Sequence, residues 1–260
     1  MNLEKNYKKV LLELLSSCNL NCSHCFYRSS NKFHSPGFLT KEQIFVLIKK
    51  MVKNKISKLV LTGGEPTLHP DFIEISEYAM LKIPRVSICT NGVILSSELE
   101  DKIMTLNFST YTVSVDSHIE KVHNEFRGSK NAFKKTISFI KKLNLNKKHI
   151  SIHITIHPKN IDHIEETIDF CKIFSDEIIV SSIYHDKLKM NVDEVKKYNK
   201  EIKLFKNKYL NHPNIVLVGF TPFCKNKNCR DLKDIFMINR RGELVSCYWK
   251  QNGGTIINKY

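Results

Sequence analysis

Glycine and proline are scarce in this sequence. Its 260 residues contain nine glycines and seven prolines, at separate positions rather than in a low-complexity run, which argues against disorder. Long apolar runs are absent as well, since no stretch reaches the roughly 20 residues that a membrane-spanning helix needs. The apolar run at residues 10–15 contains Glu13 and precedes no small-residue cleavage site, so a secretory signal is not expected. We therefore expect a globular cytoplasmic protein with no membrane partner.

Glycine motifs for nucleotide binding are also missing. Neither a G-x-G-x-x-G sequence nor a P-loop occurs, so chemistry based on nicotinamide or ATP has no support. Acidic residues are the minority, with 26 Asp and Glu against 41 Lys and Arg, which gives a net charge of +15. Such a charge suits nucleic acid, an anionic substrate or an acidic partner. The basic residues are spread along a chain rich in Lys, Asn and Ile, so nucleic-acid binding gains little from them.

The sequence does contain a regular alternation of apolar strands and amphipathic helices. The expected strands cover residues 10–15, 57–62, 85–90, 110–116, 149–156 and 177–183. The expected helices begin with one capped by Thr40 and continue at residues 71–80, 96–106, 131–143, 161–174 and 192–205. Strands that alternate with helices predict right-handed βαβ units and hence an α/β fold with a parallel sheet.

The pattern changes after about residue 210. Residues 216–220 favour a strand, and residues 235–239 and 243–247 flank Arg240-Arg241-Gly242 in a predicted β-hairpin. We predict a core domain over residues 1–210 and a small region over residues 211–260. That region is too small for a core of its own, so a bound metal would stabilise it.

Three cysteines follow the first strand. Cys18, Cys22 and Cys25 have the spacing C-x3-C-x2-C, and one loop can wrap three such thiolates around an iron–sulfur cube. Three protein ligands leave one iron open, whereas a structural zinc site wants a fourth ligand. Cys89 and Cys171 lie in predicted strand and helix segments and are expected to be core thiols. A zinc site or reduced cysteines in a core remain the alternative interpretations of the cysteine loop.

Candidate site residues gather where the other predicted strands end, as expected of a parallel β/α sheet. They are Gly63-Gly64-Glu65-Pro66, Thr90-Asn91, Ser114 and Asp116 on one strand face, Arg127-Gly128 in a predicted loop, and His153 and Thr155 on the fifth strand. Glycines allow a ligand to approach the backbone closely, and a carboxylate such as that of Glu65 accepts a hydrogen bond from an ammonium group. Turn formation and capping are the alternative explanations for these positions.

Together these motifs resemble those of the radical S-adenosylmethionine (SAM) superfamily. The resemblance implies a partial (β/α)6 barrel over residues 8–185 and a SAM-binding [4Fe–4S] cluster on Cys18, Cys22 and Cys25. It implies that Gly63 to Pro66 hold the amino group of SAM, and that Thr90, Asn91, Ser114 and Asp116 contact its ribose or carboxylate. It further implies that Arg127 pairs with that carboxylate, that His153 and Thr155 meet ribose or substrate, and that His24 and Tyr27 lie beside the cofactor. His24 stands where the family usually has an aromatic residue.

Three further cysteines, Cys224, Cys229 and Cys247, lie in the last 50 residues. Their arrangement with Gly242 resembles the start of the SPASM/twitch extension, and it implies an auxiliary iron–sulfur cluster in a shortened tail. The later cysteines of the full pattern are missing, so at most one such cluster is expected. A small zinc site or reduced thiols are the alternatives.

The resemblance implies an enzyme that cleaves SAM reductively to a 5′-deoxyadenosyl radical, which abstracts hydrogen from a substrate. A peptide in a maturation pathway is the leading substrate, and the electron donor is of the flavodoxin or ferredoxin type. The alternatives are oxidation or rearrangement of a sugar or small metabolite, tRNA modification suggested by the charge of +15, and a non-catalytic iron–sulfur sensor. The intact Gly-Gly-Glu-Pro sequence argues against a sensor, which needs no site for the cofactor's ammonium group.

Overall fold

A computed structural model describes residues 9–25, 37–175, 177–182, 191–218 and 235–245 of the chain. Its strands are β1 (Lys9–Glu13), β2 (Lys58–Thr62), β3 (Arg85–Thr90), β4 (Thr110–Ser114), β5 (Ile150–Ile156), β6 (Glu177–Ser182), β7 (Ile215–Val218), β8 (Ile235–Ile238) and β9 (Leu244–Val245). Its α-helices are α1 (Lys41–Lys53), α2 (Phe72–Lys82), α3 (Ser97–Thr105), α4 (Glu120–Arg127), α5 (Ala132–Leu145), α6 (Ile164–Lys172) and α7 (Val192–Tyr209). Two short 3-10 helices are η2 (Pro66–Leu68) and η3 (Ile161–His163).

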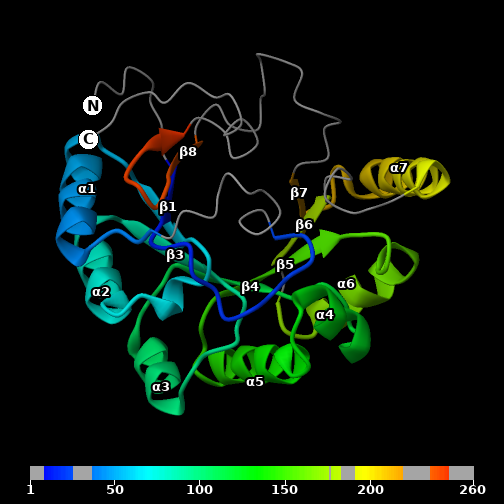
Figure 1. Cartoon of the computed structure of the whole chain (residues 1–260), viewed down its shortest axis with the longest axis horizontal. Helices are drawn as coiled ribbons and strands as arrows, with labels where there is room; N and C mark the ends of the chain where they lie inside the picture. Colours follow the sequence, from blue (N-terminus) through cyan, green and yellow to red (C-terminus); the bar gives the residue numbers. More distant parts are fainter. Residues whose placement is uncertain (1–8, 26–36, 176, 183–190, 219–234, 246–260) are drawn as a thin grey trace.

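The strands form one sheet in the order β7-β6-β5-β4-β3-β2-β1-β8-β9. All neighbours from β7 to β8 are parallel, and β8 pairs with β9 antiparallel. Figure 1 shows the curl of this sheet, with α1, α2, α3 and α5 along its outer side. The predicted α/β fold with a partial parallel barrel is confirmed, and all six predicted strands lie within two residues of their expected ends.

Local sequence signals explain where the helices begin. The Thr40 side chain accepts a hydrogen bond from the Gln43 backbone at 3.3 Å, and the Gln43 side chain accepts one from the Thr40 backbone at 2.9 Å. Such a capping box satisfies two backbone donors that the first turn leaves free. Ile44 and Ile48, one turn apart on the inner face of α1, are fully buried. The predicted N-cap and apolar face of α1 are confirmed.

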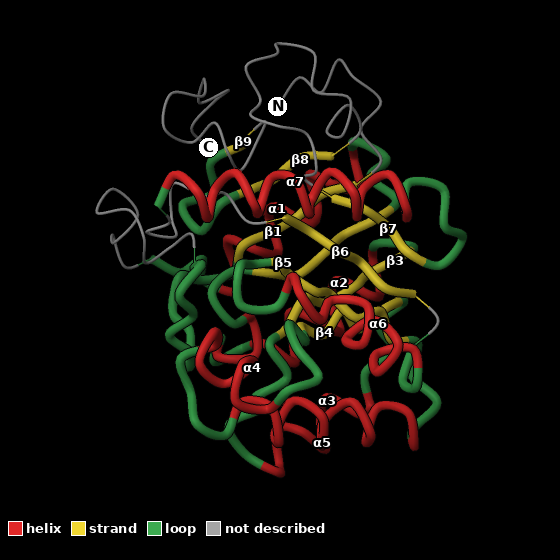
Figure 2. The backbone as a smooth tube through the Cα atoms, turned by 90° about the vertical axis from the view of Figure 1, so that its right-hand side faces the viewer, coloured by secondary structure: helices red, strands yellow, loops and turns green. Residues whose placement is uncertain are grey.

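Helices α3 and α5 lie next to each other in both views (Figures 1 and 2). The Lys142 ammonium of α5 joins them through contacts with Glu100 at 2.9 Å and with Asp101 at 2.7 Å. Beneath them, Tyr111 of β4 is completely buried in the apolar layer between sheet and helices. This layer is the hydrophobic core that holds the strand ends in place.

One helix was not predicted. Arg127 and Gly128 were expected in a loop, but Arg127 is the last residue of α4 and Gly128 caps the helix with φ of 65°. The buried residues of α4 are His123, Phe126 and Arg127, two of which are polar. Because helix periodicity is recognised from apolar residues, a helix that buries polar side chains against a site gives a weak signal.

The inner face of the sheet, opposite the helices, is largely polar. Strand side chains alternate between faces, and Val86 and Ile88 of β3 face the helices. The opposite face of β3 to β6 therefore carries, besides the apolar Ile179, the residues Ser87, Cys89, Thr112, Ser114, Ser151, His153, Thr155 and Ser181. Cys171 is buried as expected, whereas Cys89 is partly exposed on this inner face.

The segment after residue 210 contributes to the same sheet. Its strand β7 pairs with β6, and β8 pairs with β1. The predicted hairpin is confirmed by β8 and β9, with Gly242 at φ of 74° in the turn between them. At this turn Arg240 Nη1 lies 3.6 Å from Glu13 Oε2, so the tail is fastened to β1 by a buried ion pair. A separate domain over residues 211–260 stays a prediction.

No helix in the described ranges has both the length and the apolar character required to cross a bilayer.

Candidate active site

The cysteine loop, residues 16–25, leaves the carboxyl end of β1 and crosses the carboxyl ends of its neighbours. Cys18, Cys22 and Cys25 are all partly exposed free thiols on this loop. The Cys25 backbone N–H donates to the Cys22 carbonyl at 3.2 Å, and that of Leu20 donates to Cys18 Sγ at 3.5 Å. The sequence-predicted ligands thus share one short, internally bonded loop.

The first half of the cysteine loop is fixed to the end of β2. The Gly64 N–H donates to the Leu15 carbonyl and the Glu65 N–H to the Ser17 carbonyl, both at 2.8 Å. Gly63 has φ of 142°, which L side chains rarely adopt. A Cβ on Gly64 would overlap the Ser17 carbonyl oxygen. The two glycines are therefore required for the cysteine loop to lie against β2.

The second half of the loop is fixed to the end of α4. The N–H groups of Asn21 and Ser23 donate to the carbonyls of Arg127 and Phe126, at 3.2 and 2.9 Å. These carbonyls belong to the last turn of a helix, where no intrahelical donor remains for them. A Cβ on Gly128 would overlap the Asn21 carbonyl oxygen. Two glycine contacts, at Gly64 and Gly128, thus clamp the loop from opposite sides.

Glu65 is turned into the protein. Its Oε1 accepts hydrogen bonds from the hydroxyls of Thr67 and Thr90 at 2.8 Å each and from the Thr67 N–H at 3.3 Å. Its Oε2 accepts one from the Asn91 N–H at 2.8 Å. The side chain is 1% exposed, and burial raises its pKa. This geometry gives the carboxylate a positioning role between β2 and β3, and contact of its side chain with a cofactor ammonium stays a prediction.

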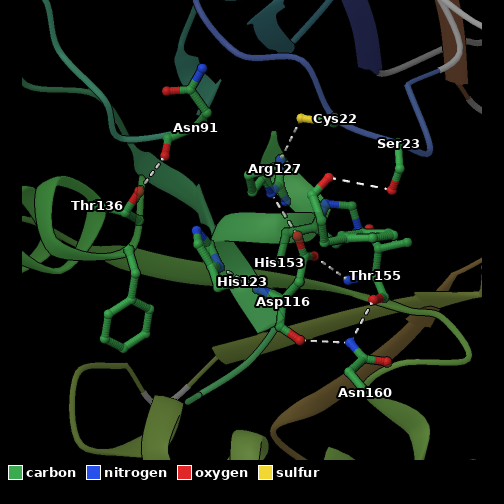
Figure 3. Close-up of polar contacts among 12 residues, drawn as sticks. Cys22, Ser23, Asn91, Asp116, His123, Arg127, Thr136, His153, Thr155 and Asn160 are labelled. Carbon is green, nitrogen blue, oxygen red and sulfur yellow. Dashed lines mark hydrogen bonds and ion pairs between the residues drawn. The ribbon is translucent and has the colours of Figure 1, made fainter. Parts of the chain in front are cut away.

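Asn91 joins the end of β3 to the cysteine loop. Its Nδ2 lies 2.9 Å from Asn19 Oδ1 and 3.7 Å from Cys18 Sγ, while its Oδ1 accepts from the Val93 N–H at 2.7 Å. Its backbone carbonyl accepts from the Thr136 hydroxyl at 2.8 Å (Figure 3). Asn91 therefore supplies a neutral donor to one of the predicted cluster ligands.

Asp116 and Arg127 form a buried ion pair beside Cys22. Arg127 Nε donates to Asp116 Oδ2 at 2.6 Å, and Arg127 Nη1 lies 4.0 Å from Cys22 Sγ (Figure 3). Asp116 is fully buried two residues beyond the end of β4, and its Oδ1 accepts from the Thr155 N–H at 3.0 Å. Burial alone would raise the pKa of Asp116, but the guanidinium outweighs it and holds that pKa well below its usual range. Both Asp116 oxygens are thus engaged within the protein.

His153 and Thr155 lie on the inner face beside this pair (Figure 3). His153 Nε2 shares a hydrogen bond with the Ser181 hydroxyl at 3.0 Å. Burial lowers the pKa of His153 to about 4, so its ring is neutral near pH 7. Ser114 is opposite His153 in the β4–β5 register. The structure brings these predicted residues to one edge of the sheet, and their contacts with a cofactor stay predictions.

Three rings stack next to the cysteine loop. His24 lies on Phe126 with ring centroids 4.3 Å apart, and Phe126 lies on His157 at 3.5 Å. Burial lowers the pKa of His24 to about 3 and that of His157 to about 4. His24 Nδ1 and His157 Nε2 have no hydrogen-bond partner among the described residues. The prediction that His24 replaces an aromatic side chain agrees with this stacked, neutral ring.

Several residues of the site were not predicted from the sequence. Phe126 and His123 belong to the unpredicted helix α4, and His157 follows β5. The Asn160 amide donates to the carbonyls of Asp116 at 2.6 Å and Thr155 at 2.9 Å. The one sequence feature that could have indicated these four residues is that they follow the ends of predicted strands. Of the predicted residues, Tyr27, Cys224, Cys229 and Cys247 lie outside the described part of the chain.

The donor set fits an iron–sulfur cluster. The three thiols of one loop suit ligands to three different irons. Burial raises the pKa of Cys18 to about 11 and that of Cys22 as well, so metal binding must displace their protons.

Comparison with protein families agrees with this geometry. The sequence pattern of the radical SAM superfamily matches residues 12–171, more than half of the chain. The chain belongs to the radical SAM superfamily. Enzymes of this family use a [4Fe–4S] cluster together with SAM, and the assignment of the cluster ligands to the three thiols of the cysteine loop stays a prediction.

Two curated relatives match part of the chain. The AdoMet-dependent heme synthase of Methanosarcina barkeri is 32% identical over 163 residues, which cover 63% of this chain and 46% of that protein. The sporulation killing factor maturation protein SkfB of Bacillus subtilis is 30% identical over 160 residues, which cover 62% of this chain and 38% of that protein. The chain thus matches less than half of the length of these relatives.

Among solved structures, Streptococcus suis SuiB bound to its precursor peptide SuiA superposes with a TM-score of 0.73 at 16% identity. The match covers 98% of this chain and 62% of SuiB. At this identity the likeness shows a shared fold. It confirms that the curled parallel sheet is the radical SAM architecture.

Proposed function

We propose that this protein is a radical SAM enzyme that abstracts hydrogen from a peptide during peptide maturation. The observation that carries the proposal is the cysteine loop, whose three thiols are clamped at the carboxyl ends of the parallel strands by Gly64 and Gly128. When bound there, the cluster and SAM supply reductive cleavage to a 5′-deoxyadenosyl radical. The work of the chain is to position these groups and to exclude water from the reacting atoms.

The residues around the loop divide into two groups in this proposal. Asn91, Ser114, His153 and Thr155, with the backbone of Gly63 to Pro66, line the edge of the sheet and are proposed to contact SAM or substrate. Glu65 and Asp116 act indirectly, since their carboxylates are already engaged by neighbouring donors. A buried carboxylate with satisfied hydrogen bonds holds its neighbours in place rather than binding a ligand.

Two observations favour a peptide as the substrate. SkfB is a maturation protein for a killing factor, and SuiB was solved with a precursor peptide. The inner face of β3 to β6 carries small polar side chains such as Thr112 and Ser181, which can hydrogen-bond a peptide backbone. The match to a heme synthase favours a second candidate, the modification of a small metabolite.

We also propose that the tail carries an auxiliary cluster on Cys224, Cys229 and Cys247, within a region over residues 211–260. Support comes from the spacing of these cysteines in the sequence. A flavodoxin or ferredoxin is the proposed electron donor, and the basic charge of +15 suits an acidic protein of this kind. The reducing cytoplasm is the proposed compartment, because it keeps cluster thiols from forming disulfides.

The test is anaerobic reconstitution followed by assay with dithionite and SAM. The expected result is 5′-deoxyadenosine, formed by the native chain and lost in Cys22→Ala. Cys171→Ala is the matched control, because it removes a thiol of helix α6 that lies outside both the loop and the inner face of the sheet. Roughly eight irons per chain would support the tail cluster, and about four would limit the chain to one cluster.

The substrate is tested in the same assay with candidate peptides and, in parallel, with porphyrins and sugars. A mass change in a peptide that depends on SAM supports peptide maturation. A change confined to a small metabolite favours the second candidate. Absence of 5′-deoxyadenosine from a chain loaded with iron and sulfide, under every substrate, would overturn the proposed activity.

A further inference from the structure

Arg127 places a cationic group beside one of the proposed cluster ligands. Its Nη1 lies 4.0 Å from Cys22 Sγ, within the range of a hydrogen bond to sulfur. Cys18, in contrast, has the neutral amide of Asn91 at 3.7 Å. The thiols of one loop therefore have electrostatically different neighbours, and the cationic one faces Cys22.

The guanidinium cannot easily leave this position. Its Nε is held by Asp116 Oδ2 at 2.6 Å, and both side chains are nearly completely buried, with 8% and 0% exposed. Asp116 is held in turn by the Thr155 N–H on its Oδ1 and by the Asn160 amide on its backbone carbonyl. The Arg127 carbonyl accepts from the Asn21 N–H of the cysteine loop. Side chain and backbone of Arg127 are thus both tied to the loop that carries Cys22.

The resemblance to the family suggests another role for Arg127, pairing with the carboxylate of SAM. The geometry argues against that role, because the guanidinium is already engaged within the protein. Its Nε is committed to Asp116, its Nη1 faces sulfur, and the residue is 7% exposed. The planar donor set of arginine can serve a carboxylate and a second acceptor at once, and here the second acceptor is the Cys22 sulfur.

We propose that Arg127, oriented by Asp116, sets the reduction potential of the cluster through its charge-assisted contact with the Cys22 sulfur. Hydrogen bonds to the sulfurs and nearby charge are among the factors that fix iron–sulfur potentials. A cation at Cys22 favours the reduced, more negative cluster, and the Asp116 carboxylate offsets part of that effect. This inference rests on the cluster of the proposed function and is independent of the substrate.

Substituting the two members of the ion pair should shift the midpoint potential of the cluster in opposite directions. Asp116→Asn leaves the guanidinium uncompensated, so the midpoint potential rises. Arg127→Gln leaves the carboxylate uncompensated, so the midpoint falls. For each, we expect the ratio of reduced to oxidised cluster at the native midpoint to change about tenfold, equivalent to about 59 mV for one electron. Arg127→Lys keeps the charge and is expected to stay closer to the native value than Arg127→Gln.

The measurement is an EPR-monitored redox titration of the reconstituted full chain, without SAM or substrate. Cys224→Ala in every variant keeps the signal of the SAM-binding cluster separate from that of a tail cluster. Ser23→Ala is the structural control, since it removes a side-chain contact between the cysteine loop and the Phe126 carbonyl of α4 without changing charge. Its midpoint is expected to match the native one. Asp116→Asn is nearly isosteric, so it tests the proposal even where Arg127→Gln does not fold.

Three results would overturn the proposal. The first is an unchanged midpoint in Asp116→Asn. The second is a shift in Ser23→Ala as large as in the charge variants, which would make loosening of the loop the cause. The third is weaker SAM binding in Arg127→Lys with native midpoints in all charge variants, which would assign Arg127 to the cofactor carboxylate. Formation of 5′-deoxyadenosine by the native chain is measured on the same preparation, so failure of the proposed function is seen separately.

Discussion

Two buried carboxylates flank the cysteine loop, and the protein compensates them differently. Glu65, on the β2–β3 side, is surrounded by neutral donors from Thr67, Thr90 and Asn91. Asp116, on the β4–β5 side, is paired with the Arg127 guanidinium at 2.6 Å. Burial raises the pKa of Glu65, whereas the guanidinium keeps that of Asp116 well below its usual range. One side of the loop is therefore held by polar contacts and the other by charge.

The difference matters because substitutions on the two sides should cost different amounts of folding free energy. Removing a neutral donor or acceptor leaves one unsatisfied polar group, which costs about 1–3 kcal/mol. Removing one member of a buried ion pair leaves an uncompensated charge, which costs about 3–5 kcal/mol. We therefore expect the Asp116 side to be the more fragile of the two, although both sides hold the loop through similar backbone hydrogen bonds.

The largest expected effect is that of Arg127→Met, which deletes the cation and leaves Asp116 buried without its partner. The free energy of unfolding should fall by about 3–5 kcal/mol. Urea denaturation of the apoprotein, followed by far-UV circular dichroism, measures it. Arg127→Met with Asp116→Leu should recover part of the loss, since both charges are then absent. A loss below 1 kcal/mol in the single variant would contradict the comparison.

Glu65→Gln should cost less, about 1–3 kcal/mol, because one amide group replaces an oxygen that accepts hydrogen bonds. The new NH2 group would face a donor, either the Asn91 N–H or the Thr90 hydroxyl. The same denaturation experiment measures this variant. A loss equal to that of Arg127→Met would mean that neutral and charged compensation are equivalent here.

Lowering the pH should destabilise the Asp116 side of the cysteine loop before the Glu65 side. His123, His153 and His157 surround the ion pair, and burial lowers the pKa of each to about 4. Because the unfolded chain binds these protons near pH 6.5, their stabilising contribution is complete above that pH and is lost as pH falls from 6.5 towards 4. Glu65 acts in the opposite direction, since its raised pKa favours the folded state in acid.

Urea midpoints measured between pH 7 and pH 4.5 test this expectation. They should fall with pH in the native apoprotein and fall less steeply in His123→Gln. His149→Gln is the control, because this ring is exposed. A stability that stays constant over this range would contradict the neutral state of the buried rings.

The smallest effect is expected for an exposed ion pair. Lys208 contacts both carboxylate oxygens of Glu165 at 2.6 and 2.7 Å, with both side chains at least half exposed. Lys208→Gln should change the free energy of unfolding by less than about 1 kcal/mol. Short distances alone would then not explain the importance of the Asp116–Arg127 pair. A loss above 2 kcal/mol would show that burial is not the deciding difference.

The fold and part of the site were predictable from local patterns. Apolar strands ending in Gly63-Gly64 and Thr90-Asn91 gave both the sheet and the edge where the site lies. Helix α4 was missed because its buried face is formed by His123, Phe126 and Arg127 rather than by aliphatic residues. The engagement of Glu65 by Thr90 and Asn91 depends on a contact 25 residues away in the sequence, which no local pattern reveals.

The clamp at Gly64 and Gly128 has a consequence for how the cysteine loop tolerates change. Ser17 and Ser23 contact the ends of β2 and α4 through main-chain atoms, both residues are exposed, and the Ser23 hydroxyl adds one side-chain contact with the Phe126 carbonyl at 3.4 Å. Exchange of these side chains should leave the cysteines in place, whereas one inserted residue would shift the register of every backbone contact after it. A library that varies these positions should therefore keep most members folded, while a library of loop lengths should lose nearly all of them. The cysteine loop should therefore tolerate exchange of its exposed side chains but not a change in its length.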